Sequence, residues 1–130
     1  METTLDGYEP FVSLLAMLGR PTRDNTRVLA TDGAFTMPVE GPLRRLGNPA
    51  RPHDSTVIGV LVALWRRGDM LYAVGVADPD TAEMLNDGRF ALGADMTGLD
   101  YERDEAGLML IKRAEVRGAV VKRAEEFAWD

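Results

Sequence analysis

The single histidine of the chain, His53, is followed directly by Asp54 and Ser55. An imidazole near an acid and a hydroxyl is what nucleophilic hydrolysis requires, with the histidine as general base and the acid orienting it. Neighbouring side chains of an extended segment point to opposite sides, so these three residues cannot form a triad with one another. An exposed loop histidine explains the same residues, and both interpretations stay open.

The chain offers few nucleophiles to such a base. It contains no cysteine, and its two serines are Ser13, inside an apolar segment, and Ser55, beside the histidine. Thr97 follows a segment of small residues and is the one threonine near a possible site. Acidic pairs are numerous, but they stand at predicted turns and helix ends, where solvated capping is their ordinary role.

The composition narrows the class of protein. The 130 residues are 45% hydrophobic and carry a net charge of −6, so we expect a single domain over residues 1–130 with no nucleic-acid partner. The absence of cysteine and the single histidine argue against metal sites, and we expect no cofactor and no metal. No apolar run approaches the ~18 residues of a membrane span, and residues 1–6 lack the features of a secretory signal, so no membrane partner is expected.

The clearest predicted element is a hairpin. Residues 56–65 and 70–77 are rich in β-branched side chains and flank the turn 66–69, which predicts two antiparallel strands. Gly59 and Gly75 inside these strands indicate a tight bend or a close approach of backbones.

A helix is predicted directly after this hairpin. Asp78 suits the N-cap, Pro79 the first helical position, and Gly88 the stop. Ala82 and Leu85 would face inward.

The other segments predict a mainly β chain. We expect strands over 11–18 and 27–31 joined as a hairpin, a strand over 35–39, a long loop over 40–52, a short strand over 90–96, a hairpin of 99–103 with 107–112, and a helical turn over 123–129. Residues 114–121 fit a helix or a strand. About seven strands with one or two helices predict a mostly β (α+β) fold, a small closed or partly closed antiparallel barrel.

The order of these segments resembles the tailed-phage prohead (capsid maturation) proteases, which look related to herpesvirus assemblins. The resemblance lies in the opening strand and polar turn, the Pro-Leu stretch, the His-Asp that precedes a Val-Gly strand, the return strand and the closing strand (residues 14–24, 38–43, 53–60, 72–76 and 116–127). It spans nearly the whole chain and implies a prohead-protease-like fold with His53 at the position of the catalytic base.

One departure from the family concerns the nucleophile. The family's serine lies in a Gly-x-Ser-like strand after the helix, whereas residues 90–96 contain no serine and Gly93 or Ala94 takes its place. Loss of a triad nucleophile removes most of the rate. The resemblance therefore implies the fold and the capsid setting, while the sequence argues against enzyme activity and leaves His53 vestigial.

These observations predict a non-enzymatic decoration or minor capsid protein that binds the major capsid protein, located in the virion and in the host cytoplasm during assembly, as a monomer or a homo-oligomer. Aromatic and arginine side chains are the usual interface anchors. The candidates are Arg44, Arg45, Arg51, Arg66, Arg67, Phe127 and Trp129. Core packing is the alternative for the aromatic residues, Trp65 included.

Two other functions remain open at this stage. One is an active maturation serine/threonine protease that uses Thr97 or Ser55 as nucleophile. The other is a small β-barrel adaptor unrelated to the proteases.

Overall fold

The computed structural model describes residues 7–25, 27–29, 35–37, 39–45 and 56–129. Its elements, in chain order, are β1 (Glu9–Met17), β2 (Arg27–Leu29), β3 (Phe35–Thr36), β4 (Gly41–Arg45), β5 (Val57–Arg67), β6 (Met70–Ala77), α1 (Pro79–Asn86), β7 (Phe90–Arg103), β8 (Met109–Arg123) and the 3-10 turn η2 (Ala124–Glu126). No helix in these ranges is long and apolar enough to cross a membrane.

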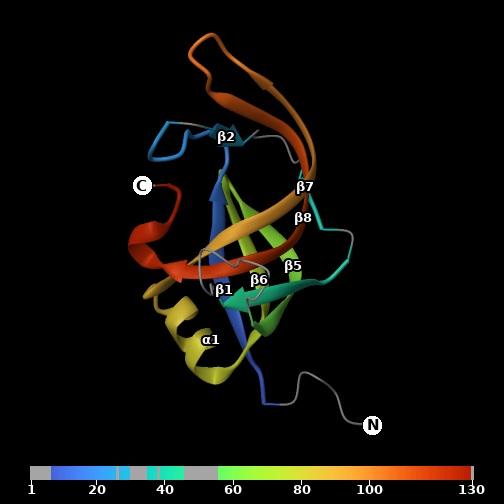
Figure 1. The fold of residues 1–130 in the computed structure, drawn as a ribbon. Coiled ribbons are helices and arrows are strands. Elements are labelled where there is room, and N and C mark those ends of the chain that lie inside the picture. The colour runs from blue at the N-terminus through green and yellow to red at the C-terminus, as the bar shows by residue number, and fades with distance from the viewer. Residues whose placement is uncertain (1–6, 26, 30–34, 38, 46–55, 130) are drawn as a thin grey trace.

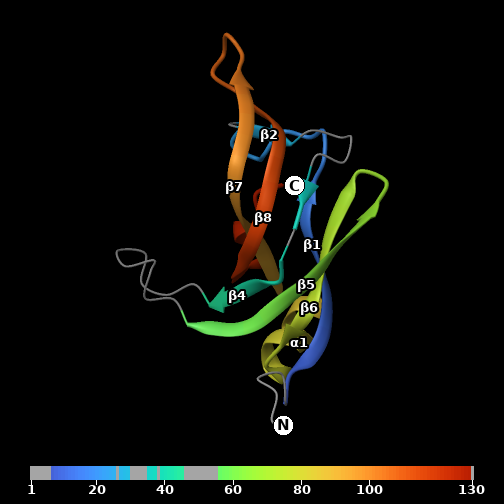
Figure 2. The ribbon, with the colours of Figure 1, turned by 90° about the vertical axis from the view of Figure 1, so that its right-hand side faces the viewer.

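The strands form one mixed sheet that curls without closing. The order is β1-β6-β5-β4-β8-β2, and β3 and β7 also pair with β8. Strands β2, β3 and β4 run parallel to β8, whereas the other pairs are antiparallel. The β7–β8 hairpin crosses the layer of β1, β5 and β6, and its outer end extends beyond the rest of the molecule (Figures 1 and 2). The predicted mostly β, partly closed, barrel-like α+β fold is confirmed.

The core fills the space inside this curl. Its largest fully buried side chains come from five of the strands and from the residue that follows β1: Phe11, Leu15, Leu18, Leu43, Leu61, Leu92, Ile111 and Val116. Burying a side chain of this size stabilises the fold by roughly 1.5–3 kcal/mol relative to leaving it exposed. The curl is therefore held by apolar contacts between strands that are far apart in sequence.

The predicted β5–β6 hairpin is confirmed, and so is the close approach at its glycines. Gly59 pairs with Ala77, and Gly75 pairs with Leu61. A Cβ at Gly59 would collide with the carbonyl oxygen of Val76, and one at Gly75 would collide with that of Val60. Only a residue without a side chain fits there.

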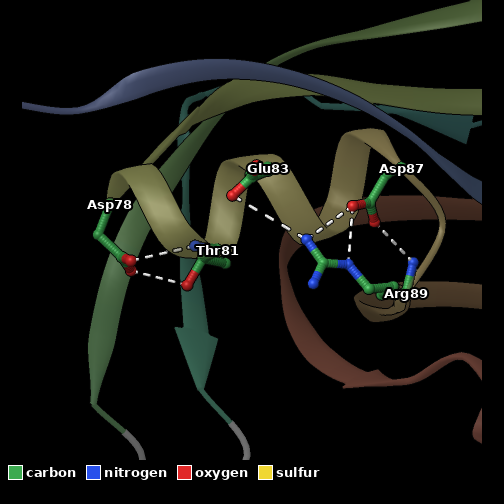
Figure 3. Close-up of polar contacts among 5 residues, drawn as sticks. All are labelled: Asp78, Thr81, Glu83, Asp87 and Arg89. Atoms are coloured by element: carbon green, nitrogen blue, oxygen red, sulfur yellow. Dashed lines mark hydrogen bonds and ion pairs between the residues drawn. The ribbon is translucent and has the colours of Figure 1, made fainter.

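The predicted helix and its start are confirmed as well. The Asp78 carboxylate accepts bonds from the backbone N–H of Thr81 (3.1 Å) and from its hydroxyl (2.8 Å) (Figure 3). Pro79 takes the first helical position, and Ala82 and Leu85 are buried. Local capping chemistry thus sets where α1 begins.

The C-terminal end of α1 is tied to neighbouring segments by two side chains. The Asn86 amide donates to the carbonyl of Pro10 (3.1 Å) and accepts from the N–H of Val12 (3.0 Å), which satisfies part of the free edge of β1. Beyond the helix, Arg89 Nε donates to Asp87 Oδ2 (2.7 Å) (Figure 3). The Asn86 bonds fix the helix against the edge of the sheet, and the Arg89–Asp87 contact lies within the turn that follows it.

One prediction about connections is wrong. Residues 11–18 and 27–31 do not form a hairpin, because β1 pairs with β6 and β2 lies parallel to β8. The 99–103 and 107–112 hairpin exists, but as the outer end of the longer β7–β8 pair, and residues 114–121 are strand. Such pairings depend on long-range packing and not on the local sequence.

The predicted loop over 40–52 is also wrong in its first part, because residues 41–45 form β4 between β5 and β8. Of its glycine and proline residues, Gly41 and Pro42 lie in this strand and pack closely against β8. A Cβ at Gly41 would collide with the carbonyl of Arg117, and a Cβ at Gly118 would stand 2.5 Å from the carbonyl oxygen of Pro42. Glycines on both strands let β4 and β8 approach closely.

Candidate functional site

The residues that the resemblance assigns to catalysis fall into two groups. His53, Asp54 and Ser55 lie outside the described residues, as does the interface candidate Arg51. Gly93 and Ala94 lie near the start of β7, opposite Val120 and Ala119 of β8.

A small pocket of about 220 Å³ lies beside Gly93. Its walls are mainly apolar, with two cationic side chains: Arg27, Leu92, Gly93, Ala94, Met96, Val120, Lys122, Ala128 and Trp129. None of these lining residues carries a hydroxyl, thiol or carboxylate side chain. We call this feature the Gly93 pocket.

The side chain of Lys122 lies over Gly93. A Cβ built at Gly93 would stand 2.6 Å from Lys122 Cε and 3.1 Å from Nζ. The space that a serine side chain would need at this position is therefore taken by the end of the lysine. An ammonium group is a hydrogen-bond donor with no nucleophilic lone pair while it is protonated.

The other hydroxyl candidates lie elsewhere. Thr97 lies in β7 opposite Glu115, and Ser13 is buried in β1 (8% exposed). Neither lines the Gly93 pocket. In the ranges that the structure describes, no group of three or more histidine, aspartate or glutamate residues could hold a metal ion.

A second feature, the hairpin-tip surface, lies at the β5–β6 turn. We define it by Trp65, Arg66 and Arg67 of β5, Asp69 of the turn, Met70 and Tyr72 of β6, and Met17 and Arg20 near the end of β1. Trp65 and Tyr72 are cross-strand partners whose ring centroids lie 5.3 Å apart. Trp65 remains 49% exposed and Met70 39% exposed.

The end of β1 completes this surface. The N–H of Leu18 donates to the carbonyl of Asp69 (2.7 Å), which ties the residues after β1 to the hairpin turn. A hollow of about 480 Å³ lies between them, lined by Met17, Arg20, Arg67, Asp69, Met70 and Tyr72. Segments far apart in sequence thus form one surface (β1, β5 and β6 in Figure 2).

The hairpin-tip surface exposes side chains of the types that protein interfaces use. Exposed aromatic, methionine and arginine side chains are enriched in the centres of protein–protein contacts. Arg20 and Arg67 line the hollow with a single aspartate, and Arg66 adds a third cation at the tip, in a chain whose net charge is −6. The surface therefore favours an acidic partner with an apolar anchor.

Two residues of this surface, Arg66 and Arg67, are interface candidates from the sequence. Both are exposed, and their part in an interface stays a prediction. Core packing is the alternative that the sequence gives for Trp65. Its place directly before a charged turn is the local signal that its side chain is exposed. Nothing local indicated that Met17 and Arg20 would join them.

The remaining interface candidates lie elsewhere. Arg44 is half-buried and Arg45 exposed on β4. Trp129 is buried at 7% exposure, and its Nε1 donates to the carbonyl of Arg20 (2.9 Å). The half-buried ring of Phe127 lies 5.6 Å from that of Trp129. For Trp129, core packing is what the structure shows.

No family model, no curated protein and no solved structure matches this chain.

Proposed function

We propose that this chain is a non-catalytic, capsid-associated protein of a tailed phage, either a decoration protein or a minor capsid protein that binds the major capsid protein lattice. The capsid setting comes from the sequence resemblance to prohead proteases. The observation that supports the non-catalytic part is the Gly93 pocket, where Lys122 covers the nucleophile position implied by the resemblance and none of the described lining residues offers a hydroxyl.

The hairpin-tip surface is the proposed contact with the capsid. Trp65 is the aromatic anchor, and Arg66 and Arg67 beside it would pair with carboxylates. The expected partner is a segment of the major capsid protein that carries acidic side chains for the arginines and an apolar side chain for Trp65. Residues of this type contribute about 2 kcal/mol or more at the centre of an interface.

The net charge of the chain favours the outer face of the shell. Inside a filled head, a protein with a net charge of −6 would face densely packed DNA and be repelled by it. No such penalty applies outside. We therefore expect the protein on the outer lattice of the virion.

Co-sedimentation tests this proposal. The purified chain is mixed with shells assembled from the major capsid protein of the virus that encodes it, and bound protein is measured in gradient fractions. We expect saturable binding with the capsid protein left intact on gels. Absence of the chain from the shell fractions would contradict the proposal, and cleavage of the capsid protein would contradict its non-catalytic part.

A further inference from the structure

A group of cationic side chains surrounds the end of β8. The Gly93 pocket and two adjoining hollows, of about 440 and 600 Å³, all have Lys122 in their walls. Their charged lining residues are the cations Arg23, Arg27, Arg45, Lys122 and Arg123 and the acids Asp24 and Glu126. In a chain of net charge −6, this is a local excess of positive charge.

The two acids of this region already have partners. Asp24 accepts a hydrogen bond from the hydroxyl of Thr22 (2.6 Å), and Glu126 accepts one from the backbone N–H of Arg123 (3.1 Å). Arg27 and Lys122, by contrast, show no ion pair with any carboxylate of the described residues. Both are half-buried, and charges removed from water are normally paired.

These two cations stand at an apolar pocket. Leu92 and Trp129, which line the Gly93 pocket, are 1% and 7% exposed. The guanidinium of Arg27 lies 6.0 Å from the centroid of the Trp129 ring, which orients it, and Lys122 lies over Gly93. Among the residues that the structure describes, no acidic side chain lines this pocket. Its chemistry is therefore complementary to a negative charge attached to an apolar group.

We propose that the Gly93 pocket captures the carboxyl terminus of a peptide chain. The terminal carboxylate pairs with Arg27 and Lys122, and the last side chain, apolar and of about leucine size, enters the pocket of about 220 Å³. Acidic residues before the terminus then face the cations of the adjoining hollows. This inference does not depend on the capsid role, because it uses neither the hairpin-tip surface nor the resemblance.

The test uses the acetylated peptide Asp-Glu-Gly-Ala-Leu with a free carboxyl terminus and the same peptide as its C-terminal amide. The chain has two tryptophans, so a Trp65→Phe variant of the full chain reports binding through Trp129 fluorescence alone. We expect a saturable change in fluorescence with the peptide that has a free carboxyl terminus. The amidated peptide should bind about tenfold more weakly, because it loses the charge-assisted contacts. Calorimetry on the unmodified chain checks that the Trp65 substitution is silent.

Two variants tie the binding to the proposed residues. Lys122→Met keeps the aliphatic stem and should weaken binding of the peptide with the free carboxyl terminus about tenfold. Arg27→Met should weaken it by a similar factor. Arg113→Met, an exposed cation elsewhere on β8, removes the same charge and should leave binding unchanged. Melting temperatures show that each variant is folded, and having two independent variants keeps the test decisive if one of them fails to fold.

Several results would overturn the inference. Equal affinity for acid and amide would show that the terminus is not recognised, and equal loss in Arg113→Met would show a non-specific charge effect. Inorganic phosphate binding as tightly as the peptide would indicate a simple anion site. N-acetyl-leucine binding as tightly would indicate a small carboxylate ligand in place of a chain terminus.

Discussion

The ammonium end of Lys122 occupies the space above Gly93 that a side chain at position 93 would need, with Lys122 Cε 2.6 Å from a Cβ built there. Strand pairing brings the two residues together, because Gly93 lies opposite Val120, two residues before the lysine. The contact involves the far end of a flexible side chain. Gly93 therefore differs from glycines such as Gly75, where the missing side chain makes room for the backbone of a neighbouring strand.

Substitution of Gly93 and of Gly75 should have different effects on stability. In Gly93→Ala the lysine can swing away, and we expect a change in the free energy of unfolding within about 1 kcal/mol. In Gly75→Ala the new Cβ meets the fixed carbonyl of Val60 and lies 3.1 Å from Phe11, which should cost roughly 1–3 kcal/mol. Urea unfolding measures both, and equal losses would contradict this distinction.

Substitution of His53 should not change the fate of the capsid protein. If the chain is non-catalytic, neither the natural chain nor His53→Ala cleaves the capsid protein during a long incubation, because no hydroxyl among the described residues lines the Gly93 pocket. Gel electrophoresis of the shells over time measures this. Cleavage by the natural chain that disappears in His53→Ala would restore the protease interpretation.

Charge reversal at the hairpin tip should weaken shell binding. Arg66→Glu with Arg67→Glu places carboxylates where the proposed partner is acidic, and co-sedimentation should fall about tenfold or more. Both side chains are exposed, so the melting temperature of the variant should equal that of the natural chain. Arg113→Glu with Arg117→Glu makes the same change in net charge at exposed positions of β8 and is the matched control. Equal losses in both pairs would remove the hairpin tip from the interface.

The two tryptophans should separate binding from stability. Trp65→Ala removes a half-exposed ring that contacts Tyr72, and it should cost about 1 kcal/mol of stability while strongly reducing shell binding. Trp129→Ala removes a buried ring and its bond to Arg20, and it should destabilise the fold by roughly 3–5 kcal/mol. Unfolding curves and co-sedimentation are measured on both. A Trp65→Ala protein that binds normally would contradict the proposed anchor.

The cap of α1 gives a test of the fold itself. Asp78→Ala removes both bonds to Thr81 and should lower the free energy of unfolding by about 1 kcal/mol. Asp80→Ala in the first turn is the control, since it removes only a favourable charge near the helix N-terminus and should cost roughly a few tenths of a kcal/mol. Thermal unfolding compares the two variants. Equal losses of stability would show that the hydrogen bonds of Asp78 add nothing to the effect of a negative charge near the helix N-terminus.

What the sequence alone determined is local. Asp78, Pro79 and Gly88 set the helix, and two β-branched runs on either side of the turn at Gly68 and Asp69 set the β5–β6 hairpin. Capping bonds and short turns join neighbours in the chain, so their signals can be read in a window of a few residues. The mostly β class followed from the same windows.

The tertiary structure decided which strands meet. Local patterns give no register between distant segments, so the pairing of β1 with β6 and the insertion of β4 beside β8 could not be read from them. The same holds for both surfaces. Arg20 reaches the hairpin tip, and Lys122 reaches Gly93, through contacts that the packing of the curled sheet alone creates.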